Sequence, residues 1–295
     1  MPNTAVAIIG LGIMGSAFSR NLIAAGFAVR GYDPATARQE AMAADGVLIA
    51  ASAAAAVQGC PIAIASLPSV AALEATVDAL VAAPCRGLVV VEASTFPIEA
   101  KEAARERLAA AGMKLLDCPI SGTGAQAVNR DLAIFASGDE AAHLGCRAVF
   151  AAIARVTHYV GAFGNGSRMK FIANLLVAVH NVATAEAMVL GVRSGLDADK
   201  IIDVISSGAG NSRIFELRGP MMARQNYRPT SASTHVFQKD SGIIAAFAKR
   251  LGVDTPMLDA AAPLFDEADR MGFGDDDVAA VHAVLARRAG LGRNG

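Results

Sequence analysis

The sequence predicts an α/β fold in which a doubly wound, mostly parallel sheet is followed by a long interdomain helix and an all-α domain. Apolar strand-like runs alternate with alanine-rich helical stretches in the first half of the chain, which favours a parallel sheet. A glycine-rich turn follows the first run, and only helical patterns follow the long helix at about residues 167–193. The chain has 295 residues, enough for two domains, which we expect at residues 1–162 and 163–295.

The composition excludes several classes of protein. Apolar residues make up 54% of the chain, charged residues 18%, and the net charge is -1, with no run of Lys or Arg to bind nucleic acid or an anionic membrane. The four cysteines are scattered without a C-x-x-C or a Cys/His cluster, so we expect no metal site and no disulfide framework. No signal-type segment follows Met1. We therefore expect a cytoplasmic protein.

The glycine-rich turn is Gly10-Leu11-Gly12-Ile13-Met14-Gly15, between the strand-like run Ala5 to Ile9 and a helical pattern over Ser16 to Ala25. Glycines at this spacing allow a tight turn, a close approach of pyrophosphate and close packing of the helix on the strand, as in Rossmann-like domains. The amides and the dipole at the start of the helix attract phosphates. The alternative is an ordinary glycine turn, since the pattern alone is weak evidence.

Asp33 follows the second predicted strand, Phe27 to Tyr32, and lies about 20 residues beyond the turn, where a carboxylate can accept hydrogen bonds from an adenosine ribose. A carboxylate there repels a ribose 2′-phosphate, so NAD is the expected cofactor. NADP is the alternative, because Arg30 and Arg38 are close in sequence. A solvated turn aspartate before Pro34 is the structural alternative.

Further strand-like runs follow at Val47–Ile49, Ile62–Ser66, Leu88–Val91, Lys114–Leu116, Leu132–Ala136 and Thr157–Val160. Ligands of parallel sheets bind beyond the carboxyl ends of the strands. Three such ends carry small polar residues: Ser66 to Ser69, Glu92 to Thr95 and Asp117 to Gly124. Each alone is equally typical of an ordinary loop.

The pattern changes at Gly161 to Gly166, where we expect the domain boundary before the long helix. Asn174, Asn181 and Glu186 interrupt its apolar run, so we expect a buried helix and not a membrane span. From Gly195 onward the helical segments break near Gly208–Gly210, Arg228–Pro229, Gly252–Pro256 and Met271–Gly274.

Lys170 and Asn174 are one helical turn apart and share a face of the long helix, with Asn181 on about the same stripe. A low dielectric and the positive end of the helix disfavour a charged amine at Lys170, which suits it to proton transfer. A lysine extending to solvent is the alternative. The dipeptide Lys239-Asp240 is typical of a solvated helix surface. The five histidines are dispersed and there is no G-x-S-x-G sequence, so covalent catalysis is not expected.

Taken in order, these segments resemble the β-hydroxyacid dehydrogenase family, which includes 3-hydroxyisobutyrate, threonate and, more distantly, 6-phosphogluconate dehydrogenases. The resemblance spans almost the whole chain. It rests on GLGIMGSAFSRNLIAAG (Gly10 to Gly26), SLPS (Ser66 to Ser69), ST (Ser94, Thr95), DCPISGTGAQA (Asp117 to Ala127), GAFGNGSRMKFIAN (Gly161 to Asn174) and QKD (Gln238 to Asp240).

The resemblance implies a site between a Rossmann-like domain and a helical domain, and a homodimer or homotetramer. Lys170 would be the acid/base that takes the hydroxyl proton as hydride passes to nicotinamide. Ser121 and the backbone of Gly122 and Thr123 would hold the carboxylate of a small hydroxy acid, and Asn174 would bind the substrate and orient Lys170. The cofactor would be lined by Leu67, Pro68 and Thr95, with Lys239 near the nicotinamide.

The chain departs from the family pattern at two of these positions. The usual Gly-Gly after the serine is Gly122-Thr123, and Lys-x-x-Asn-Asn is Lys170-Phe-Ile-Ala-Asn174. The stretch Ala209 to Glu216 is similar to the threonate dehydrogenase branch, which would place Asn211, Ser212 or Arg213 near a polyhydroxy substrate. Two other functions stay open: imine reduction on the same scaffold, where Lys170 is usually replaced, and a non-catalytic dinucleotide-binding sensor.

Overall fold

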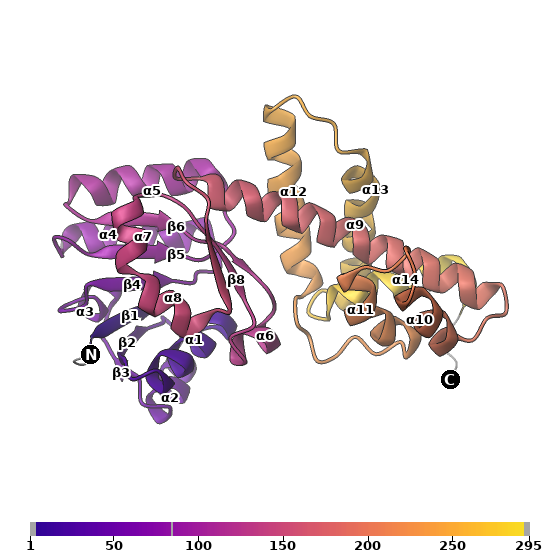
Figure 1. Cartoon of the computed structure of the whole chain (residues 1–295), viewed down its shortest axis with the longest axis horizontal. Helices are drawn as coiled ribbons and strands as arrows, with labels where there is room; N and C mark the ends of the chain where they lie inside the picture. The colour runs from indigo at the N-terminus through magenta and orange to yellow at the C-terminus, as the bar shows by residue number, and fades with distance from the viewer. Residues whose placement is uncertain (1–3, 84, 292–295) are drawn as a thin grey trace. The chain divides into compact units, whose positions relative to one another are not determined.

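The computed structural model describes residues 4–83 and 85–291 (Figure 1). By its internal contacts the chain forms two compact units, Met1–Lys170 and Phe171–Gly295. The division falls within one long helix, α9 (Asn165–Arg193), whereas the sequence predicts the boundary in the loop before that helix.

The first unit contains a six-stranded sheet in the order β3-β2-β1-β4-β5-β6, with every neighbouring pair parallel. Because the order runs outward from β1 in both directions, the crossover helices cover both faces. The structure therefore confirms the predicted doubly wound sheet. Its strands are β1 (Ala5–Ile9), β2 (Ala28–Tyr32), β3 (Leu48–Ile49), β4 (Ile62–Ala65), β5 (Val89–Glu92) and β6 (Lys114–Asp117).

Both faces of this sheet are buried, which explains why its strands are continuous apolar runs. Val6 and Ile8 face a core that includes Phe18, whereas Ala7 faces a second core with Leu73. Figure 1 shows the sheet with its helices. The helices of this unit before α9 are α1 (Ile13–Ala24), α2 (Thr36–Ala44), α3 (Ala53–Ala56), α4 (Val70–Ala82), α5 (Ile98–Ala110), α6 (Gly124–Val128), α7 (Glu140–Gly145) and α8 (Arg147–Ile153).

The last two predicted strands form, but they do not join the main sheet. They are β8 (Ala133–Ala136) and β9 (Val156–Tyr159), which pair with β7 (Ile120–Ser121) in a second, three-stranded sheet. Asp117 at the end of β6 exchanges two backbone hydrogen bonds with Ser137, of 3.0 and 2.8 Å. Pro119 has no N–H to continue the hydrogen bonding of β6 with β5, so the chain leaves the six-stranded sheet there.

The second unit is helical, as the sequence predicts. After the rest of α9 it contains α10 (Ala198–Ser206), α11 (Arg213–Ala223), α12 (Thr234–Arg250) and α13 (Pro256–Ala268), then a π-helical turn, a 3₁₀ turn and α14 (Val281–Arg288). The rings of Phe237 and Phe265 lie 6.0 Å apart between α12 and α13. The breaks between these helices fall at the predicted Gly and Pro stretches.

A buried ion pair joins α11 to the segment before the 3₁₀ turn. Arg218 Nε lies 2.8 Å from Asp277 Oδ1, and both side chains are buried. Burial alone raises the pKa of Asp277, but the guanidinium and hydrogen bonds from Ser231 and Ala279 outweigh it and lower the pKa below 3.8. The pair therefore contributes stability above that pH and loses it as Asp277 protonates at lower pH.

His282 of α14 makes the stability of the chain depend on pH. Burial lowers its pKa from 6.5 to about 4, so the folded chain keeps the imidazole neutral where the unfolded chain protonates it. The unfolded chain then binds more protons between these values, and the free energy of unfolding falls as the pH falls. We expect His282→Gln to reduce the slope of the free energy of unfolding against pH over this range by roughly 1.4 kcal/mol per pH unit, which corresponds to about one proton.

Urea unfolding between pH 7 and 4 measures this slope. His235→Gln, which removes an exposed imidazole that contacts Asp269 and Asp275 in the same unit, is the control and should change the slope less than His282→Gln does. An equal slope in His282→Gln would contradict the assignment.

Candidate functional site

The glycine turn has the geometry that close approach of a ligand needs. A Cβ atom at Gly10, where φ is +92°, would lie 2.1 Å from the carbonyl oxygen of Ser66, and one at Gly15 would lie 1.8 Å from the carbonyl oxygen of Gly10. At Gly12 the nearest atom would be Arg38 Nη1, 3.9 Å away. Two glycines therefore allow backbone packing, while the third borders open space.

The start of α1 is suited to hold phosphate. Gly12 is its N-cap residue and supplies no side-chain cap to the first amides of the helix. These amides and the positive end of the dipole lie at the open space beside Gly12, which is the arrangement that binds pyrophosphate. The residues present thus fit a dinucleotide cofactor.

Asp33 is buried directly beneath this turn. Its Oδ2 accepts a hydrogen bond from Leu11 N at 2.8 Å, and its Oδ1 accepts one from Ala35 N at 2.9 Å. The half-exposed Arg38 guanidinium approaches Oδ2 to 3.4 Å. The carboxylate therefore fixes the glycine turn to the end of β2, and its remaining lone pairs are what a ribose hydroxyl would use.

The loops after β4 and β5 are connected to each other and to the glycine turn. Ser94 Oγ accepts a hydrogen bond from Leu67 N at 2.8 Å. A Cβ at Gly10 would lie 3.5 Å from Leu67 Cδ2, so Leu67 packs against the turn. Thr95 is half-buried next to Ser94, and Pro68 is exposed. These loops border the same sheet edge as the glycine turn.

The segment Ser121 to Gly124 lies against the glycine turn as well. A Cβ at Gly124 would lie 2.4 Å from Ile13 Cγ2. Gly122, at φ +135°, would place a Cβ 2.4 Å from Leu132 Cδ2, so a larger residue does not fit there. The half-buried Ser121 ends β7. The chain thus brings the predicted carboxylate-binding segment to the predicted cofactor turn.

Thr123 takes part in a capping box at the start of α6. Its Oγ1 accepts from Gln126 N at 3.3 Å, and its own N–H donates to Gln126 Oε1 at 3.0 Å. This backbone N–H, which we predicted to meet the substrate carboxylate, therefore has an internal partner. Ser121 Oγ and the backbone of Gly122 are the other predicted donors of this segment.

Lys170 lies in the second turn of α9 and is 9% exposed. In the second unit, buried Asn174 donates through Nδ2 to Asp240 Oδ2 at 2.7 Å. The Lys239 ammonium lies 3.2 Å from Asp240 Oδ1, and its side chain is 39% exposed. Asp240 thus fixes the amide of Asn174 and contacts Lys239. In the sequence Asp240 stands out only as part of the QKD segment, which gives no sign of this contact.

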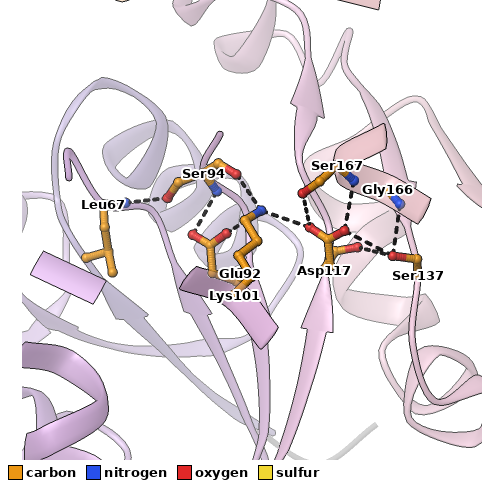
Figure 2. A network of polar contacts seen from close by, with 8 residues as sticks. All are labelled: Leu67, Glu92, Ser94, Lys101, Asp117, Ser137, Gly166 and Ser167. Atoms are coloured by element: carbon orange, nitrogen blue, oxygen red, sulfur yellow. Dashed lines mark hydrogen bonds and ion pairs between the residues drawn. The ribbon is translucent and has the colours of Figure 1, made fainter. Parts of the chain in front are cut away.

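A buried polar network at the ends of β5 and β6 was not predicted (Figure 2). Lys101 of α5 contacts Glu92 Oε2 at 2.6 Å and Asp117 Oδ1 at 2.8 Å, and all three side chains are fully buried. One signal was available in the sequence. Lys101 occupies the face of α5 that also buries Ile98, Ala104 and Leu108, a position where an apolar residue is expected.

The three residues proposed for a polyhydroxy substrate make local contacts at the start of α11. Asn211 Nδ2 donates to Ser206 O and Glu216 Oε1, at 2.9 and 2.8 Å. Ser212 caps the helix through Phe215 N, and Arg213 pairs with Glu216 at 3.1 Å. Within the described residues, no cluster of three or more His, Cys, Asp or Glu side chains is placed to hold a metal ion.

One helix of the described chain, α9, is long and apolar enough to cross a membrane by length and composition. The mean hydropathy of its apolar window is 1.7, and 39% of that window is buried within the chain. A single such helix is weak evidence for a membrane span, because core helices of globular proteins have the same properties.

The sheet order and the glycine turn define a dinucleotide-binding, Rossmann-like protein. The model of the NAD-binding domain of 6-phosphogluconate dehydrogenase matches residues 5–161, and that of the NAD-binding domain of NADP-dependent 3-hydroxyisobutyrate dehydrogenase matches residues 164–285. The chain belongs to the β-hydroxyacid dehydrogenase family and contains its NAD(P)-binding domains.

Individual relatives agree with this membership. A probable 3-hydroxyisobutyrate dehydrogenase of Mycobacterium bovis is 31% identical, over 96% of this chain and 99% of that protein. The L-threonate dehydrogenase of Cupriavidus necator is 39% identical over 175 residues, which span 59% of each protein. The structure of Mycobacterium tuberculosis 3-hydroxyisobutyrate dehydrogenase with L-serine matches with a TM-score of 0.88 and 30% identity, covering 96% of this chain and 99% of that chain.

We predict that the preference between the two cofactors depends on Asp33. We expect Asp33→Ala to weaken NADH binding about tenfold, since the turn loses its buried acceptor, and to shift the ratio of kcat/KM from NAD toward NADP. Arg38→Ala removes the neighbouring cation and should shift the ratio the other way. Fluorescence titration with NADH and NADPH and the two kcat/KM values measure this. An unaltered ratio in Asp33→Ala, or an unaltered protein that prefers NADP, would refute the role of Asp33.

Proposed function

We propose that this chain is an NAD-dependent dehydrogenase, or reductase in the reverse direction, that acts on the hydroxyl of a short hydroxy acid, with Lys170 as its acid/base. The observation that carries the proposal is that Lys170, near the start of α9, is only 9% exposed and belongs to the same unit as the glycine turn, whose geometry fits a dinucleotide. A buried amine next to a hydride-transfer site has a direct use in moving the hydroxyl proton.

The proton step belongs to this chain's own residues. Lys170 Nζ, as the neutral amine, accepts the proton of the substrate hydroxyl while the hydrogen on the same carbon leaves as hydride, so the alcohol becomes a carbonyl. The bound nicotinamide supplies the hydride acceptor. In the reverse direction the ammonium returns the proton to the carbonyl oxygen. The amine stabilises the transition state more than the resting alcohol, because the O–H bond weakens as the hydride departs.

Substrate orientation is assigned to Ser121, Gly122 and Asn174. With the N–H of Thr123 engaged by Gln126, the Ser121 hydroxyl and the Gly122 backbone are left to bind the carboxylate. Asp240 accepts from Asn174 Nδ2, which turns the amide so that Oδ1 is the atom left to accept from a hydroxyl or an ammonium. An anchored carboxylate fixes the distance and angle of the reacting carbon.

The matched relatives suggest the substrates to test. Their names refer to threonate and 3-hydroxyisobutyrate, and one related structure contains L-serine. All three are small acids that carry a hydroxyl group and a carboxylate. Appearance of the reduced-nicotinamide absorbance with threonate, glycerate, 3-hydroxyisobutyrate and serine, each with NAD and NADP, identifies the substrate. No change with any acid, despite measurable NAD binding, would favour a non-catalytic sensor.

Imine reduction on the same scaffold is the second enzyme function. The resemblance implies that Lys170 is usually replaced in that branch, so its presence here favours hydroxy acids. Turnover of a cyclic imine that exceeds turnover of every hydroxy acid would reverse this assignment.

We predict that Lys170→Ala lowers kcat by about 10² or more and changes NAD affinity little, because the lysine is needed for proton transfer and not for holding the dinucleotide. Lys200→Ala, at an exposed position of α10, is the matched control. Steady-state kinetics and NADH titration separate the two effects. Normal turnover in Lys170→Ala would rule out the acid/base role.

We also propose that the protein is cytoplasmic and that two or more copies associate through α9. The α9 side chains Ile172, Leu176 and Leu190 are 58, 49 and 72% exposed, at spacings that place them along one face of the helix. Such an apolar stripe is typical of a helix that packs on a second copy. All four cysteines are free thiols, which suits a reducing compartment.

Leu176→Glu places a charge in this stripe and should shift the protein toward the monomer, since an interface cannot bury the carboxylate without a partner. Leu251, outside α9, is 62% exposed, and Leu251→Glu should leave the association unchanged. Sedimentation velocity measures the mass of each. A monomeric unaltered protein, or equal masses for all three, would contradict the interface.

A further inference from the structure

We propose that Lys101 is a positioning residue for the reaction. Its buried ammonium connects the loops after β4 and β5 to the start of α9, and so holds Lys170 at a fixed place relative to the strand ends where the cofactor is expected. The inference rests on the proposed function, because it assumes that Lys170 moves the proton. All the residues that carry it belong to the first unit.

Lys101 sits at the centre of a cluster of three buried charges. Its Nζ lies 2.6 Å from Glu92 Oε2 and 2.8 Å from Asp117 Oδ1, and it donates to Ser94 O at 2.7 Å. Burial alone lowers the pKa of Lys101, but the two carboxylates outweigh it and raise the pKa above 10.5. The ammonium thus stays charged and holds two strand ends together.

One side of the cluster holds the first turn of α9. Asp117 Oδ2 accepts from Ser167 N at 2.8 Å, and Asp117 Oδ1 accepts from Ser167 Oγ at 2.8 Å. Ser137 Oγ accepts from Gly166 N at 3.0 Å, and its hydroxyl can donate to Asp117 O at 3.1 Å or to Asp117 Oδ2 at 3.2 Å (Figure 2). One cation and two carboxylates leave a net negative charge, which the positive end of the helix offsets.

The approach at Gly166 is direct backbone packing. A Cβ there would lie 2.3 Å from the carbonyl oxygen of Phe135 and 2.7 Å from that of Asp117. The helix start therefore rests on the ends of β6 and β8 with no side chain between them. Lys170 follows Ser167 by three residues, less than one turn, so its Cα position is set by these contacts.

The other side of the cluster holds the loops that border the cofactor turn. Glu92 Oε1 accepts from Ser94 N at 2.9 Å, and Ser94 Oγ accepts from Leu67 N at 2.8 Å (Figure 2). Leu67 packs on the glycine turn, and Thr95 adjoins Ser94. A single ammonium is thus connected to both the cofactor loops and the helix of the proposed acid/base.

Stability alone does not explain this arrangement. Removing three charges from water is costly, and apolar residues of similar volume often fill such a site with equal or greater stability. Directional contacts at fixed distances are what an apolar core does not supply. Hydride transfer is sensitive to displacements of about 1 Å, so a rigid connection between helix and loops has a catalytic use.

Lys101→Met keeps most of the length of the unbranched side chain and removes the charge. We expect kcat for oxidation of the hydroxy acid to fall about tenfold or more, with KM for the acid changed less than threefold. We also expect a shift of the acidic limb of the kcat–pH profile, where protonation of Lys170 removes the base. Lys101→Arg keeps a cation and should restore part of kcat. Arg107→Ala, which removes an exposed ion pair on the same helix, is the matched control and should behave as the unaltered protein.

A double variant, Ser137→Ala with Ser167→Ala, removes hydroxyl contacts to the same carboxylate and decides the matter if Lys101→Met does not fold. It should lower kcat about fivefold and move the same limb. Unchanged kcat and pH profile in the folded variants, with only the melting temperature lowered, would overturn the positioning role. If Lys170→Ala keeps the limb, the proposed function itself fails; if Lys170→Ala loses it and the Lys101 variants do not move it, only the positioning inference fails.

Discussion

The contact of Lys101 with Glu92 and Asp117 is the interaction on which the order of the loop after β5 and of the start of α9 depends. Two parallel strands end in carboxylates at the same edge of the sheet, and without a cation between them these buried charges would repel each other. With the ammonium present, the remaining oxygens are free to accept backbone amides. Those amides belong to the segments where a dinucleotide-binding domain needs order: the loop after β5 and the start of α9.

A third buried carboxylate, Asp33, acts in the same way at the glycine turn. It accepts the amide of Leu11 and leaves the amides of α1 open. In both places a buried carboxylate accepts hydrogen bonds from backbone N–H groups and so fixes the segments that carry them. Thr123 illustrates the reverse case, since Gln126 has already taken the N–H that a glycine pair would offer to a substrate. The substrate carboxylate is therefore assigned to fewer donors than the family pattern implies.

Local patterns predicted the strands, the glycine turn and the helical second unit, because each depends on periodicity and on Gly or Pro at breaks. The separate sheet of β7, β8 and β9 was not predicted, since strand pairing is a long-range choice that short apolar runs do not encode. Lys101 was missed because a lysine in a charged helix is ordinarily solvated, and its two partners lie on other elements. The contact of Asp240 with Asn174 joins residues far apart in sequence and has no local signal.

A crystal structure of this protein with oxidised cofactor and L-threonate bound would show whether Lys170 meets the substrate hydroxyl. We expect pyrophosphate on the amides beside Gly12, the substrate carboxylate on Ser121 and Gly122, and a substrate hydroxyl within about 3 Å of Lys170 Nζ. A hydroxyl at the nicotinamide that contacts a different acid or base, with the Lys170 amine turned away from the substrate, would contradict it.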